Sequence, residues 1–132
     1  MNQTLQYQQI RSAYMTKILD DLNMSTSEYV GYVTQIKVLT PPSELPSDLV
    51  GLEARTAARL AWRANELSII LEGKTQALYV RKYQLALTEL RVAVEKPPSA
   101  DDTEIEEKTL QFMQASYDLG GALAKLAHIK FD

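Results

Sequence analysis

Residues Asp48–Lys96 read DLVGLEARTAARLAWRANELSIILEGKTQALYVRKYQLALTELRVAVEK, and this stretch decides the fold. It contains no proline, its only glycines are Gly51 and Gly73, and it is rich in Ala, Leu, Arg and Glu, which form helices readily. We therefore predict one long central helix over about residues 48–96. At about 1.5 Å per residue it would be roughly 70 Å long, so it would protrude, bend back at Gly73 or pack against other copies.

Apolar residues in this stretch follow two lines on a helical wheel. The members of the first line lie seven residues apart: Leu71, Leu78, Leu85 and Val92. The second line has alternating three- and four-residue steps: Val80, Tyr83, Leu87, Leu90 and Val94, continued upstream by Trp62 and Ile69. One neighbouring helix covers one line, so two lines need neighbours on two sides. We expect the first line to form a homo-oligomer interface, with the middle helix of an intrachain bundle as an equal alternative. Trp62, Tyr79 and Tyr83 could stack nucleic-acid bases, as aromatic residues of single-strand binders do, but we favour Trp62, Ile69 and Tyr83 as core residues.

Basic side chains gather on one sector of the same stretch. The candidate nucleic-acid-binding residues are Arg55, Arg59, Arg63, Lys74 and Arg81. The first three follow each other at i,i+4 spacing, which places them side by side on a helix. Residues 48–96 carry eight basic and six acidic residues, a net charge of 8 − 6 = +2, whereas the whole chain has a net charge of −3. The sector indicates either an anion-binding surface or a solvated face with local ion pairs.

The rest of the chain completes a single all-α domain over residues 1–132, with three to four helices in an elongated bundle or hairpin. Residues 4–22 predict a first helix, and residues 25–39 predict a short second one, although the β-branched residues of 29–39 also suit a strand. Residues 40–47 form a proline-rich linker. A final amphipathic helix begins near Asp101, and its apolar line is Ile105, Phe112, Leu119 and Leu126.

Composition excludes several classes of protein. The chain has no Cys and a single histidine, His128, so we expect no metal, no cofactor and no catalytic residues. No Gly-x-Ser-x-Gly motif is present, and we interpret the chain as a non-enzyme. The first residues, MNQTLQYQQIR, do not predict a signal peptide, and no run of about 18 apolar residues predicts a membrane span. These features favour a cytoplasmic location.

The residues Glu53–Leu67 and Tyr79–Tyr83 resemble small helical proteins encoded by bacteriophages. In the order of its helices, the region from Asp48 to Asp132 is also similar to the phage recombination-mediator (UvsY-like) family. That resemblance implies a helical, oligomeric protein that acts on single-stranded DNA and its recombinase in the host cytoplasm. We therefore hypothesise a non-enzymatic oligomeric accessory protein of phage recombination or replication that contacts single-stranded DNA and a DNA-processing protein. A protein–protein adaptor or inhibitor without nucleic-acid contact, and a virion assembly component, are the alternatives.

Overall fold

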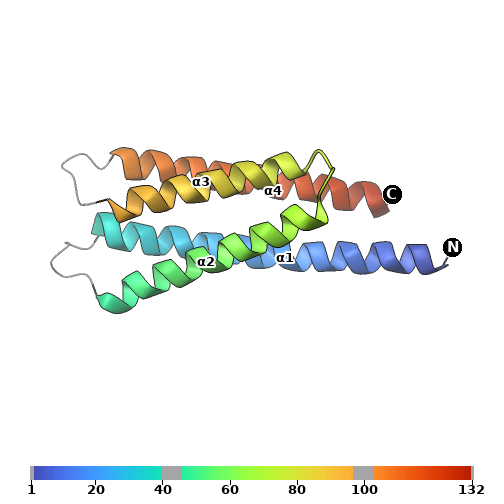
Figure 1. Ribbon diagram of the computed structural model, residues 1–132, viewed down its shortest axis with the longest axis horizontal. Coiled ribbons are helices and arrows are strands. Elements are labelled where there is room, and N and C mark those ends of the chain that lie inside the picture. Colours follow the sequence, from blue (N-terminus) through green and yellow to red (C-terminus); the bar gives the residue numbers. More distant parts are fainter. Residues whose placement is uncertain (1, 40–45, 97–102, 132) are drawn as a thin grey trace.

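The chain forms a four-helix bundle (Figure 1). The computed structural model describes the backbone of residues 2–39, 46–96 and 103–131 and the side chains of residues 13–37, 46–96 and 103–125. The elements are α1 (Asn2–Thr34), one turn of π-helix η1 (Gln35–Leu39), α2 (Ser47–Ile70), α3 (Ala77–Glu95) and α4 (Thr103–Phe131). These described ranges contain no strand. The predicted all-α class is therefore confirmed, and residues 29–39 are helical.

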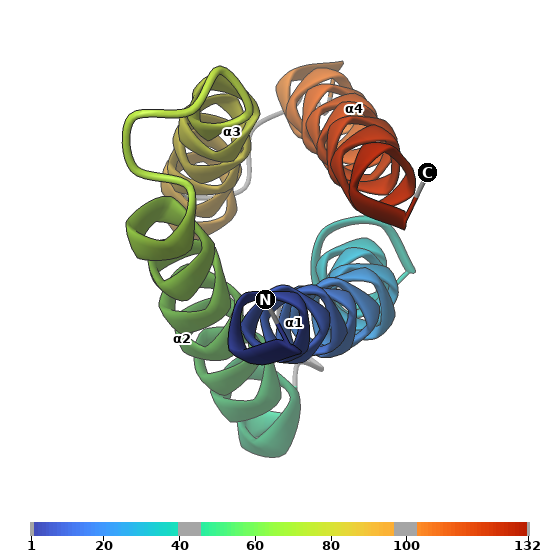
Figure 2. The same cartoon turned by 90° about the vertical axis from the view of Figure 1, so that its right-hand side faces the viewer.

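Consecutive helices run in opposite directions, and the four lie around one long axis (Figures 1 and 2). Viewed along that axis, α1 and α3 lie diagonally across the bundle (Figure 2). The helices pack most extensively in the pairs α1 with α2 and α3 with α4, and least extensively where α1 meets α4. The bundle is therefore closed on three sides and more open on the side between α1 and α4.

The predicted single helix over residues 48–96 is two helices, α2 and α3, joined by a turn at residues 71–76. Gly73 lies in this turn with φ +80°, a left-handed conformation that only glycine adopts without strain. The amide of Lys74 donates to the carbonyl of Leu71 at 2.9 Å and closes the turn. Of the three outcomes expected for so long a helix, the structure has the reversal at Gly73.

The two helices predicted for residues 4–22 and 25–39 are one continuous element. The helix α1 runs through residue 25, where the second helix was predicted to begin, and Ser25 and Thr26 are buried against the bundle. The hydroxyl of Thr26 has a partner on another helix, Tyr83, so it serves packing between helices and does not begin a new one. Residues 40–45 of the predicted linker and the predicted start of the last helix at Asp101 lie outside the described residues.

Most of the described residues on the apolar lines predicted for α3 and α4 are buried in the core, whereas Val94 and Ile105 are partly buried and the side chain of Leu126 lies outside the described part. Val80, Tyr83 and Leu90 are fully buried on α3, and Phe112 and Leu119 on α4. The buried residues of α2 follow the same helical spacing: Ala57, Leu60, Ala64 and Leu67.

A buried polar cluster ties three helices together near one end of the core. The Tyr29 hydroxyl of α1 donates a hydrogen bond of 2.7 Å to Oε1 of Glu53 on α2, and both residues are buried. Arg91 of α3 approaches the same oxygen with its Nε at 3.4 Å, within ion-pair distance. The Nη2 of Arg91 donates a hydrogen bond of 3.3 Å to Oε1 of Glu95. Burial, reinforced by the bond to Glu53, raises the pKa of Tyr29 far above its ordinary value, so the phenol stays a donor.

Three further residues extend this cluster across the bundle. The hydroxyl oxygens of Thr26 and Tyr83 lie 2.9 Å apart in the core, one on α1 and the other on α3. Phe112 of α4 contacts the rings of both Tyr29 and Tyr83, with centroid distances of 6.0 and 5.1 Å. The edge-on contact with Tyr29 is a favoured aromatic geometry. All four helices therefore meet at this layer of the core.

We predict opposite effects of alanine at two glycines. Gly73→Ala places a Cβ in a left-handed conformation and should lower the free energy of unfolding by about 1–2 kcal/mol. Gly51→Ala, inside α2 where an added Cβ contacts nothing within 4 Å, should raise it by about 0.5–1 kcal/mol. Urea titration of both variants checks this, and a stabilised Gly73→Ala protein would mean that α2 and α3 are continuous.

The buried cluster gives a second prediction. Tyr29→Phe leaves a buried Glu53 oxygen with one donor fewer and should lower the free energy of unfolding by about 1–3 kcal/mol. Tyr32→Phe is the matched control, because Tyr32 lies on the same helix, only part-buried, and makes no side-chain hydrogen bond to the described residues. Its cost should be below about 0.5 kcal/mol. Equal costs for the two variants would contradict the role of the Tyr29 hydroxyl.

Candidate nucleic-acid interface

The candidate surface is the outer face of α2, opposite the buried line of that helix. Arg55, Arg59 and Trp62 follow each other at spacings of four and three residues, so they lie along one side of the helix. All three are exposed, and 68% of Trp62 is accessible to solvent. Ile69, also exposed, follows Trp62 at a distance of seven residues on the same line. We call Arg55, Arg59 and Trp62 the outer α2 face.

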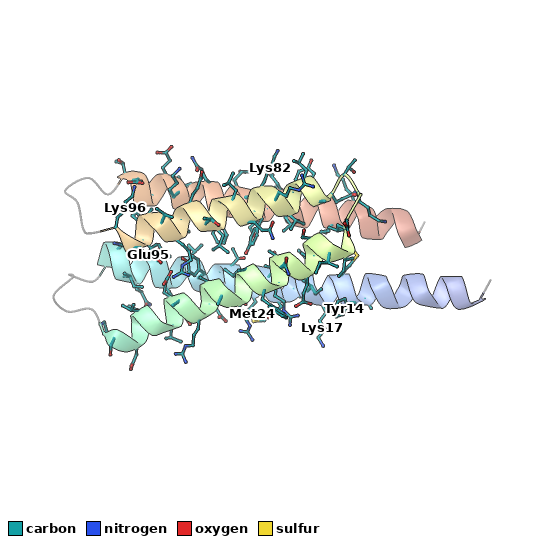
Figure 3. The ribbon with its side chains drawn as sticks, viewed as in Figure 1. Tyr14, Lys17, Met24, Lys82, Glu95 and Lys96 are labelled. Atoms are coloured by element: carbon teal, nitrogen blue, oxygen red, sulfur yellow. The ribbon has the colours of Figure 1, made fainter. Side chains whose placement is uncertain are left out.

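Arg63 belongs to a contact between helices and is turned away from this face. Its Nε donates to Asp21 of α1 at 2.7 Å, and another nitrogen donates to Glu66 at 3.1 Å. Glu66 also accepts a hydrogen bond of 2.7 Å from the hydroxyl of Tyr14. Figure 3 shows Tyr14 on the part of α1 next to the C-terminal end of α2. These four side chains form a polar seam that joins α1 to α2.

The hydrogen bonds of the seam change the pKa values of two of its side chains. The hydrogen bond to Asp21 raises the pKa of Arg63, and the bond to Glu66 raises the pKa of Tyr14. Arg59 lies at the edge, with its Nε 3.9 Å from Asp21 and most of its side chain exposed. An exposed pair at that distance contributes little energy, so Arg59 can exchange it for another anion. Arg63 has two short ionic contacts to give up.

The remaining basic residues of the predicted sector do not continue the same line. Lys74 lies in the turn between α2 and α3, and Arg81 lies on α3, so the five residues are divided among three segments of the chain. Among the described residues, no carboxylate lies within ion-pair distance of Arg55, Lys74 or Arg81. Arg55 donates only to the carbonyl of Gly51 in its own helix, at 3.3 Å. Arg55 and Arg59 are therefore the predicted residues that the structure groups together.

Trp62 and Ile69 are exposed, which corrects the prediction that they belong to the core. That prediction extended the second apolar line of residues 80–94 upstream with a constant helical period. The chain reverses at Gly73, so residues on the two sides of the turn do not share a face. The spacing within α2 alone held the correct signal, because Trp62 lies opposite the line of Ala57, Leu60 and Ala64.

The predicted oligomer line is divided in the same way. Leu71 lies in the turn and is fully buried in the core, so it is not available to another copy. Leu78, Leu85 and Val92 all lie on α3 and are half-exposed or more, on the side of α3 that points away from the bundle. We call these three residues the α3 ridge. The ridge is an apolar line that no described part of this chain covers.

The described residues contain no cluster of three or more His, Asp or Glu side chains arranged to hold a metal ion. The side chain of His128 lies outside the described part. In the same ranges, no helix is both long and apolar enough to cross a membrane.

The fold defines the chain as an all-α, up-and-down four-helix bundle with an exposed arginine–tryptophan face. Comparison with known proteins adds no narrower class. No family model matches the chain, and no curated protein or solved structure matches it either.

The exposure of Trp62 can be measured directly, because it is the only tryptophan of the chain. We expect its fluorescence to peak near the wavelength of tryptophan in water and to be quenched readily by acrylamide. Unfolding in urea should then shift the emission very little. A blue-shifted emission maximum that moves to longer wavelength on unfolding would place Trp62 in an apolar environment. If dilution of the folded protein alone removes the blue shift, a second copy covers the ring.

Proposed function

We propose that this protein is a non-enzymatic accessory protein that contacts single-stranded DNA through the outer α2 face. The observation that carries the proposal is the exposure of Trp62 beside two arginines on one side of a helix. Proteins that bind single strands combine positive charge along the backbone with aromatic rings on which bases stack. Trp62 offers the ring, and Arg55 and Arg59 offer planar guanidinium groups that donate two parallel hydrogen bonds to a phosphate.

The geometry supports single strands better than a duplex. Only an unpaired base exposes both of its faces to a side chain, and a ring that stands on a convex helix can meet such a base without entering a groove. Arg55 lies seven residues from Trp62 on one side, about two helical turns, and Arg59 lies one turn away. Two phosphates on the same side of a stacked base can thus each reach an arginine while the strand follows the axis of α2.

The net charge of −3 opposes long-range attraction, so several copies must act together. Salt screens charges beyond about 10 Å, which leaves the local arginines free to act at short range. A homo-oligomer would repeat the outer α2 face and supply avidity, and the α3 ridge is the surface we assign to that assembly. The resemblance of Glu53–Leu67 and Tyr79–Tyr83 to small helical proteins of bacteriophages is our reason to place this function in phage recombination or replication, in the cytoplasm beside a DNA-processing protein.

The proposal is tested with a fluorescent oligo-deoxythymidine and anisotropy titrations at several salt concentrations. We expect affinity to fall as salt rises, and Arg55→Gln with Arg59→Gln to reduce the slope of log affinity against log salt by about 0.7 for each lost phosphate contact. Trp62→Ala should weaken binding by about 5- to 100-fold, because it removes one stacked base. Far-UV circular dichroism should show that helicity is unchanged.

Two controls separate this face from the rest of the surface. Ile69→Ala removes an exposed apolar side chain from the same line of α2 without removing a ring, and Lys125→Gln removes an exposed charge from α4. Both variants should bind as the wild type does. The proposal is rejected if binding is undetectable at low salt, or if Trp62→Ala and Ile69→Ala weaken it equally.

A protein–protein adaptor is the second candidate, because the α3 ridge is an exposed apolar line of the kind that partner helices cover. An adaptor would lose its partner with Leu85→Asp and keep it with Arg55→Gln and Trp62→Ala. The two candidates therefore differ in which helix carries the sensitive residues.

A further inference from the structure

A groove with a volume of about 720 Å³ runs between α1 and α4, on the side where these helices pack least. It lies across the bundle from α3 (Figure 2). Asn23 and Ser27 line it from α1, and Met113, Tyr117, Gly120 and Gly121 line it from α4. None of its lining residues carries a charge. Tyr117 is the most exposed large apolar side chain among the described residues, at 79%.

The two glycines in the groove are not required by the fold of one copy. A Cβ added at either position would contact nothing within 4 Å, and neither residue has a positive φ. Alanine in a helix is more favourable than glycine, so the two glycines destabilise α4, and no close packing contact within the chain requires them. Glycine does lower the wall of the groove and would allow another helix to come close.

The α3 ridge has the length and character of an occupant for this groove. Leu78 and Val92 lie 14 residues apart, so the ridge is about 21 Å long. On α1, the lining residues extend from Leu19 to Val30, which is about 17 Å along that helix. Leu85 stands at the middle of the ridge with 60% of its surface exposed. Uncharged side chains are thus available on both surfaces over comparable lengths.

Charges beside the two surfaces are complementary. Arg81 and Lys82 lie beside the ridge, next to Leu78 and Leu85 in helical register, and no described carboxylate is within ion-pair distance of either. Asp20 is exposed and lies one turn before Asn23 on α1, and it pairs with no basic side chain in the described ranges. Glu89, which lies one turn after Leu85 on the ridge side of α3, already pairs with Lys108 of α4. The unpaired side chains beside the ridge are therefore basic, and Asp20 beside the groove is acidic.

We propose that the α3 ridge of one copy docks into the α1/α4 groove of the next copy. This inference rests on the self-association in the proposed function and adds the surface that receives the ridge. The occupant is a second copy because one chain presents both halves of the contact, on opposite sides of the bundle. Such a contact joins different surfaces of two copies, so the assembly closes into a ring or continues as a filament.

Two variants test the halves separately, with mass measured by light scattering in the absence of DNA. Leu85→Asp disables the ridge, because a charge would be buried without a partner. Gly120→Leu fills the groove at a position where the protomer has room. Wild type should have a mass that is a multiple of 14.9 kDa, and each variant alone should be monomeric. Gly120→Leu should also keep the helical circular dichroism of wild type and unfold cooperatively, which separates loss of assembly from loss of folding.

Mixing the two variants provides the decisive result. Leu85→Asp keeps an intact groove and Gly120→Leu keeps an intact ridge, so an equimolar mixture should form a dimer of one copy of each and stop there. Ile69→Asp, an exposed position on α2, is the control and should assemble as wild type does.

Three outcomes would overturn the docking. The first is a Gly120→Leu variant that assembles like wild type, because the groove would then be empty. The second is a mixture that stays monomeric, and the third is a wild type that is monomeric at the highest concentration it tolerates. None of these results depends on DNA. A protein that docks in this way and fails to bind the oligonucleotide would reject the proposed function and keep the inference.

Discussion

The bundle depends on the contacts that the buried carboxylate of Glu53 makes with two other helices. The carboxylate is buried on α2, accepts a hydrogen bond from Tyr29 on α1 and lies at ion-pair distance from Arg91 on α3. A charge buried without such partners is strongly destabilising, and an alternative register of any of the three helices would remove one of them. Apolar contacts tolerate sliding because they have no direction, whereas these polar contacts have one geometry. We therefore infer that the cluster selects this packing over other arrangements of the same apolar faces.

Sequence patterns predicted the core wherever one helix carries its own period. Val80, Tyr83 and Leu90 on α3, and Phe112 and Leu119 on α4, are buried as their spacing indicates. The same reasoning failed at residues 71–76, because a single glycine in a helical pattern costs only about 1 kcal/mol. Whether the chain continues or reverses there depends on the apolar area that α2 and α3 bury after reversal. That area cannot be derived from the spacing of residues along the chain.

The candidate site was predictable in part. Arg55 and Arg59 lie on the exposed side of α2 as their spacing suggests, but Arg63 pairs with Asp21, which is 42 residues away in the chain. Such a partner is brought near only by the packing of α1 against α2. Trp62 was misplaced for the related reason that its line was extended past a turn. In both cases the error lies in how helices meet, which also decides where α1 continues and where α2 gives way to α3.

The contact between Thr26 and Tyr83 has a consequence for the groove between α1 and α4. Thr26 lines that groove and also shares a hydrogen bond with a tyrosine in the core, so one side chain belongs to both the interior and the surface. The floor of the groove is thereby held by the same packing that holds the bundle. A surface fixed in this way loses little conformational entropy when it is covered, which makes it preorganised for whatever docks there.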